Sequence, residues 1–131
     1  MGIERDYLMR QLMMLFEVIQ KIIRYRKKGE NKPAMDEIKY FYKCLKIDES
    51  VQKKGINELL DYLVSDRKLT NEHLEMIAFV LKEQGELEKD ANEKLNFFRK
   101  AYFLLDKVDR ESINFSMDRQ MKLAELRIHI N

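Results

Sequence analysis

The fold is decided by residues 3–28, which read IERDYLMRQLMMLFEVIQKIIRYRKK. Apolar residues recur here at intervals of three and four, which predicts one long helix because an α-helix turns about 100° per residue. The centre of the apolar face consists of Leu8, Leu12, Leu15, Ile19 and Ile22. Further apolar residues flank this centre on both sides, so the apolar arc is about twice the roughly 100° that one packing partner covers. We therefore expect the helix to be covered on two sides, by its own chain or by a second copy.

The rest of the chain also predicts helices and no convincing strand. A length of 131 residues, 45% hydrophobic and 37% charged, is typical of one soluble, helix-rich domain over residues 1–131. Four glycines and one proline leave few breaks in regular structure. Short polar connections between helices favour antiparallel neighbours. The expected fold is therefore all-α, with about six helices stacked as antiparallel hairpins.

The ends of the predicted helices follow from local signals. Pro33 fits the first turn of the second helix, and the third helix spans about residues 56–64. Helices four to six can be capped by Thr70 or Asn71, by Asp90 and by Ser116, respectively. Gly85 is expected to end or bend the fourth helix. The sixth helix has two apolar rows, which predicts two packing neighbours; one row is Met117, Met121, Ala124 and Ile128.

Signals for a membrane or a secretory route are lacking in the sequence. The most apolar stretch, residues 12–23, is interrupted by Glu17, Gln20 and Lys21, so it does not predict a membrane span. Glu4 and Asp6 stand where a signal peptide needs positive charge. A single cysteine fits a reducing compartment. These features predict a cytoplasmic protein.

Two stretches resemble known families. The segment 92–101, NEKLNFFRKA, resembles the second helix of a tetratricopeptide repeat, and residues 38–45 align weakly with residues 95–102. The segment 4–11, ERDYLMRQ, resembles the opening of a family of small uncharacterised bacterial helical proteins that begin E-R-D-Y-[LI]-M-R-Q. Members also contain an S-x-x-R turn before the last helix, matched here by Ser116 to Arg119. This resemblance implies a bacterial, cytoplasmic, all-helical protein and implies no activity.

The opening helix supplies the candidate partner-binding residues. They share a position near the helix start or on the flanks of its apolar arc: Arg5, Tyr7, Met9, Arg10, Met13, Met14 and Phe16. Methionine is flexible and polarisable, so a methionine-rich face is suited to an adaptable interface, although it also fills ordinary cores. Asp6 and Arg10 are four residues apart and can pair, so the polar cluster is more readily interpreted as a structural contact that docks the N-terminus on a neighbouring helix.

A basic segment follows and suggests an alternative ligand. It consists of Arg24, Arg26, Lys27, Lys28 and Lys32, within a chain whose net charge is only +2. Basic residues near a helix C-terminus are favourable through the helix dipole. The alternative reading is a small regulatory protein that binds nucleic acid through residues 24–32.

Residues suited to catalysis or metal binding are few and scattered. His73 and His129 are read as surface residues, and Glu125 and His129 lie four apart, but two ligands do not make a metal site. Cys44 is read as a buried, inert thiol. We therefore expect no enzyme activity, no cofactor and no metal, and a protein–protein interaction module that binds a partner or forms a homodimer through the first helix.

Overall fold

The computed structural model describes residues 2–48, 51 and 53–130, and its regular structure is entirely helical within those residues. Six α-helices are present there: α1 (Gly2–Lys27), α2 (Asn31–Cys44), α3 (Ile56–Asp61), α4 (Asn71–Leu87), α5 (Ala91–Glu111) and α6 (Met117–Ile130). They pack as adjacent antiparallel pairs, which confirms the expected all-α class. The chain divides into two compact units, residues 1–49 and 50–131. The expectation of one domain stays a prediction.

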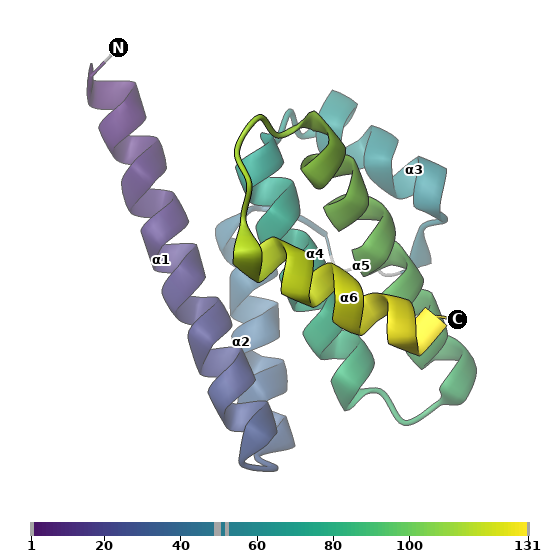
Figure 1. Cartoon of the computed structure of the whole chain (residues 1–131). Helices are drawn as coiled ribbons and strands as arrows, with labels where there is room; N and C mark the ends of the chain where they lie inside the picture. Colours follow the sequence, from purple (N-terminus) through teal and green to yellow (C-terminus); the bar gives the residue numbers. More distant parts are fainter. Residues whose placement is uncertain (1, 49–50, 52, 131) are drawn as a thin grey trace. The chain divides into compact units, whose positions relative to one another are not determined.

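The first unit is a hairpin of α1 and α2 (Figure 1). Gly29 ends α1 with a φ of +76°, a conformation that glycine adopts without steric cost. The Gly29 amide donates to the carbonyl of Arg26 and the Glu30 amide donates to that of Tyr25, the two bonds of a Schellman turn. The chain therefore reverses within three residues, and α2 returns along α1.

The apolar contact of this hairpin lies toward its closed end. On α1 the buried residues include Leu15, Ile19 and Ile22, the C-terminal part of the predicted apolar centre. Three buried residues of α2 form one face: Ala34, Ile38 and Phe41 follow intervals of four and three, and Leu45, just after the helix, continues the row. Leu8 and Leu12, nearer the start of α1, are only half-buried.

The second unit is built around α4, α5 and α6. Three caps that the sequence predicts are confirmed in it. In each cap a side-chain oxygen accepts a hydrogen bond from a backbone amide three residues later. The pairs are Thr70 with His73, Asp90 with Glu93, and Ser116 with Arg119. These bonds satisfy amide donors that a helix start leaves without intrahelical partners. The helix boundaries here are thus local properties of the sequence.

Gly85 has a different role from the one expected. It does not end α4, which continues to Leu87. A methyl group at residue 85 would lie 2.6 Å from a ring carbon of Phe98 on α5. The missing side chain therefore lets α4 and α5 approach closely, and Phe98 fills the space.

The third predicted helix is only partly regular. α3 ends at Asp61, and the chain continues through a single π-helical turn at Tyr62–Asp66. Leu59 and Leu63 are buried, whereas Val64 is exposed. The π turn adds one residue to the ring of each hydrogen bond, which rotates the following side chains around the axis.

Candidate interaction surface

The candidate partner-binding residues lie on the N-terminal half of α1 and are all exposed. Five of them are large and apolar, and their side chains are between 39% and 71% exposed: Tyr7, Met9, Met13, Met14 and Phe16. The two basic members, Arg5 and Arg10, are also exposed. Isolated exposed apolar residues are common in proteins, but five within ten residues of one helix are an unusual concentration.

The lengths of the two helices of the first unit limit how much of α1 the hairpin covers. α1 has 26 residues and α2 has 14. At 1.5 Å per residue they are about 39 and 21 Å long, so α2 reaches only about the middle of α1. Figure 1 shows the N-terminal half of α1 extending beyond the end of α2. In the hairpin, the first three turns of α1 therefore have no facing helix.

The exposed apolar side chains fall on two sides of α1. Met9, Met13 and Phe16 are spaced by four and three residues and so form one row. Tyr7 and Met14 lie on another side of the helix, roughly 140° away at 100° per residue. The row Met9–Met13–Phe16 is turned well away from the buried Leu15 and Ile19. We refer to these three residues as the outer row of α1.

The basic segment surrounds the turn of the first hairpin. Arg24, Lys27 and Lys28 are exposed, and Arg26 is half-buried. Lys32 lies 3.8 Å from the carboxylate of Asp36 one turn later, a long and solvent-exposed pair. Such a pair contributes little to stability. The structure thus brings three exposed cations together at one end of the hairpin.

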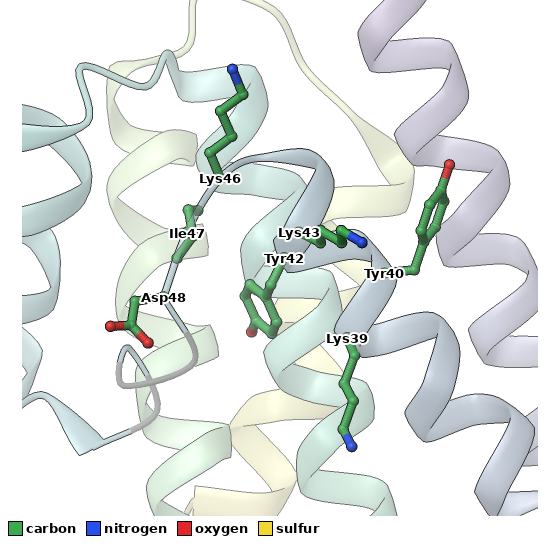
Figure 2. A pocket seen from close by; sticks show the side chains of 7 residues that line it. All are labelled: Lys39, Tyr40, Tyr42, Lys43, Lys46, Ile47 and Asp48. Carbon is green, nitrogen blue, oxygen red and sulfur yellow. The ribbon is translucent and has the colours of Figure 1, made fainter.

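A pocket of about 690 Å³ lies near the end of α2 (Figure 2). Its lining includes three lysines: Lys39, Lys43 and Lys46. Figure 2 shows their side chains pointing in three different directions, so they do not converge on one anionic group. The sequence did not predict this pocket.

Cys44, next to this pocket, is half-buried. The prediction of a fully buried thiol is therefore wrong. Its thiol lies near the hydroxyl of Tyr40 and raises the pKa of Tyr40. The two residues are one helical turn apart on α2, which brings their side chains to the same face.

The largest polar cluster in the second unit is centred on Arg119, which is buried. Its Nε donates to Asp109 Oδ1 at 2.9 Å, its Nη1 to Glu75 Oε2 at 3.2 Å and its Nη2 to the carbonyl of Asn114 at 2.8 Å. Bonds from Arg119 and then Gln120 lower the pKa of Asp109. One guanidinium thus joins α4, α5, the α5–α6 loop and α6. The S-x-x-R motif marked this position, but its partners are distant in sequence.

His73 is buried, so its reading as a surface residue is wrong. Its Nδ1 lies 3.3 Å from the amide of Thr70 and accepts from it, while the Thr70 hydroxyl lies 2.8 Å from the same nitrogen. Burial lowers the pKa of His73. His73 therefore occupies the position of the glutamate or glutamine in a usual capping box. The spacing of three residues between Thr70 and His73 is visible in the sequence.

The residues considered for a metal have other partners. Glu125 pairs with Lys82 on α4 at 2.9 Å. The Nε2 atom of His129 lies 3.2 Å from Glu86, and its ring stacks on Phe98 with centroids 4.2 Å apart. These contacts attach α6 to α4 and α5. Among the residues that the structure describes, no group of three or more His, Cys, Asp or Glu side chains is arranged to hold a metal ion.

One apolar row of α6 is exposed, contrary to the expectation that both rows have neighbours. Leu123 and Leu126 of the other row are buried. The exposed row consists of Met117, Met121, Ala124 and Ile128. Figure 1 shows α6 lying across α4 and α5 at the edge of the second unit, so within this unit only one face of α6 meets another helix.

No helix in the described part of the chain is long and apolar enough to cross a membrane. Comparisons of the chain with protein-family models, with curated proteins and with solved structures found no match. The family resemblance of residues 4–11 and the tetratricopeptide-like packing of residues 92–101 therefore stay predictions. The structure describes a small, all-helical protein.

Proposed function

We propose that this protein is a non-enzymatic interaction module that binds another protein chain through the N-terminal half of α1. The observation that supports this most directly is the outer row of α1, in which three large apolar side chains lie exposed on a face that α2 leaves uncovered. Leaving such side chains in water forgoes about 1.5–3 kcal/mol for each one that could be fully buried. Contiguous exposed apolar patches are therefore typical of surfaces that bind a partner.

The composition of this patch also fits a protein ligand. Methionine and aromatic side chains are enriched in protein–protein interfaces, as is arginine. Here Met9, Met13 and Phe16 form the outer row, while Arg5 and Arg10 lie beside it. Methionine side chains adapt to the shape of the surface opposite them. The patch thus has an apolar centre and a charged border.

Stacked helical hairpins, packed in the tetratricopeptide-like manner, are the architecture we propose for presenting this surface. Two apolar rows run along α5, and residues of both are buried. Phe98 and Leu105 belong to one row, and Phe97, Ala101 and Leu104 belong to the other. A helix with two buried rows contacts neighbours on two sides. The exposed row of α6 leaves room for one more helix at the edge of the stack.

Site-specific photo-crosslinking in the host cell tests this proposal. A photoreactive phenylalanine analogue at residue 13 is expected to form adducts with another protein chain. The same analogue at Met121 is the matched control, since both residues are exposed methionines on helices. Adducts from residue 121 alone would place the binding surface on α6 instead of α1. A folded protein that forms no adduct from residues 9, 13 or 16 would contradict the proposal.

A second candidate function is nucleic-acid binding through the basic segment 24–32. Three exposed cations at the end of the first hairpin, Arg24, Lys27 and Lys28, support it. Contacts of lysine and arginine with phosphates release counterions, so such binding falls steeply as salt rises. Fluorescence anisotropy with generic DNA and RNA tests it, with Lys27→Glu/Lys28→Glu as the weakened variant. Absence of binding at about 50 mM salt, where phosphate contacts are strong, would contradict this candidate.

A further inference from the structure

The outer row of α1 continues into a seam with the spacing of a coiled coil. Met9, Met13, Phe16 and Gln20 are separated by four, three and four residues, and all four are exposed. This alternation is the heptad pattern in which two core positions recur every seven residues. Three of the four side chains are apolar. The exposed face of α1 is therefore suited to pair with another helix along its length.

The charges beside this seam select the orientation of that helix. Arg10 follows Met9, and Glu17 follows Phe16, so both lie on the same edge of the seam one heptad apart. Seven residues span about 10 Å, too far for the two side chains to pair within one helix. Both are exposed. A second α1 in the opposite direction brings Arg10 of each copy beside Glu17 of the other.

We infer that this protein forms a homodimer in which the α1 helices of two copies pack antiparallel along this seam. In that register Met13 lies opposite Phe16 of the second copy, and Met9 lies opposite its Gln20. Arg10 of one copy and Glu17 of the other then lie between these two layers, and the two-fold axis generates a second, identical pair. The inference rests on the proposed function, since it names the partner of the same surface.

A parallel pair of α1 helices fits the same residues poorly. In parallel coiled coils, a residue at one edge of the seam faces the residue five positions later in the other helix. Arg5 would then face Arg10 of the second copy, and the two-fold axis would repeat this like-charge contact. Like charges placed opposite each other suppress an association. The charge pattern therefore favours the antiparallel arrangement.

The first hairpin leaves this face of α1 accessible. The seam is centred roughly 130° around the helix from the buried Leu15, Ile19 and Ile22, at 100° per residue. Those residues lie on the side that α2 covers. The pairing thus needs no rearrangement of the hairpin. A contact along residues 6–23 is about 27 Å long, which is small for a stable dimer. We expect a dissociation constant on the order of tens of micromolar.

Sedimentation equilibrium on the full chain, over a concentration series and with charge-reversal variants, tests the inference. Arg10→Glu replaces each of the two ion pairs of the dimer with a pair of carboxylates, and Glu17→Arg replaces each with a pair of guanidinium groups. Each variant is expected to weaken self-association about tenfold or more, from the loss of two attractive pairs and the gain of two repulsive ones. The double variant restores both pairs and is expected to dimerise within about threefold of the original protein.

Mixing the two single variants gives the sharpest result. Arg10→Glu chains and Glu17→Arg chains are complementary at both pairs, so the mixture is expected to form heterodimers although each variant alone is monomeric. Arg99→Glu, the same charge change at an exposed residue of α5, is the control and should leave the dimer unchanged. Circular dichroism verifies that every variant keeps its helix content.

Three outcomes would overturn the inference: a monomeric original protein at several hundred micromolar, single variants that dimerise like the original, or a double variant that stays monomeric. The proposed function has its own outcome. If the protein is monomeric while residue 13 still crosslinks to a different protein, the homodimer is wrong and the interaction surface stands. If neither association occurs, both are wrong.

Discussion

Replacing Gly85 with alanine is expected to destabilise the second unit, although the same change usually stabilises a helix. The new methyl group would lie 2.6, 2.8 and 3.1 Å from three ring carbons of Phe98. Carbon atoms in contact prefer about 3.5–4.0 Å, so the ring must move by roughly 1 Å. Phe98 is buried and stacked on His129, which leaves it little space.

The size of the effect follows from two opposing contributions. Overpacking a buried position costs about 1–3 kcal/mol, and the contacts of 2.6 and 2.8 Å place this substitution in the upper part of that range, at about 2–3 kcal/mol. Alanine is better than glycine in a helix interior by about 1 kcal/mol. The net expectation for Gly85→Ala is a loss of about 1–2 kcal/mol in the free energy of unfolding. For a chain of this size, this corresponds to a fall of about 4–8 °C in Tm.

Urea denaturation followed by circular dichroism measures this change. Gly55→Ala is the matched control, because nothing lies within 4 Å of the methyl group it would add and the backbone has an ordinary negative φ. Phe98→Leu removes the ring, so Gly85→Ala should become neutral or stabilising in that background. A Gly85→Ala protein as stable as the original, or more stable, would refute the close contact between α4 and α5.

Two other predictions concern the polar contacts of the second unit. Arg119→Met removes a buried cation and leaves the carboxylates of Asp109 and Glu75 without their partner. We expect a loss of about 2–3 kcal/mol in the free energy of unfolding, measured by urea denaturation. A loss below about 0.5 kcal/mol, the usual range for surface changes, would argue against this cluster. The pKa of His73 is below its ordinary value of 6.5 in the folded state because the ring is buried, so the unfolded chain binds more protons. The contribution of neutral His73 to the free energy of unfolding should therefore be complete above pH 6.5 and fall as the pH drops below it. Urea denaturation from pH 7 to pH 5, compared with His73→Asn, measures this. An identical pH dependence of stability in the two proteins would contradict it.

Local signals in the sequence predicted much of the second unit. The caps at Thr70, Asp90 and Ser116 are correct because a cap depends on a side chain and an amide only three residues away. The burial of Leu123 and Leu126 on α6 follows from apolar periodicity. What periodicity does not carry is which of two apolar rows meets a neighbour.

The candidate surface was predicted in its residues but not in its cause. A wide apolar arc on the first helix indicated a second contact, and Met9, Met13 and Phe16 are indeed exposed. The exposure arises because α2 packs on a different side of α1, a relation between two elements that the pattern of one helix does not contain. The register of the proposed dimer then comes from Arg10 and Glu17, which are visible in the sequence once that face is known to be free.

The sequence by itself determined the helical class, the helix starts and the apolar faces, because each depends on residues within about one or two turns of each other. Only the tertiary structure decided that Gly85 makes room for Phe98, that Arg119 joins Asp109 to Glu75 and that His73 is buried. These contacts join residues on different helices, between 10 and 44 positions apart for the Arg119 pairs. Such contacts form only when packing brings distant segments together, and no local pattern specifies them.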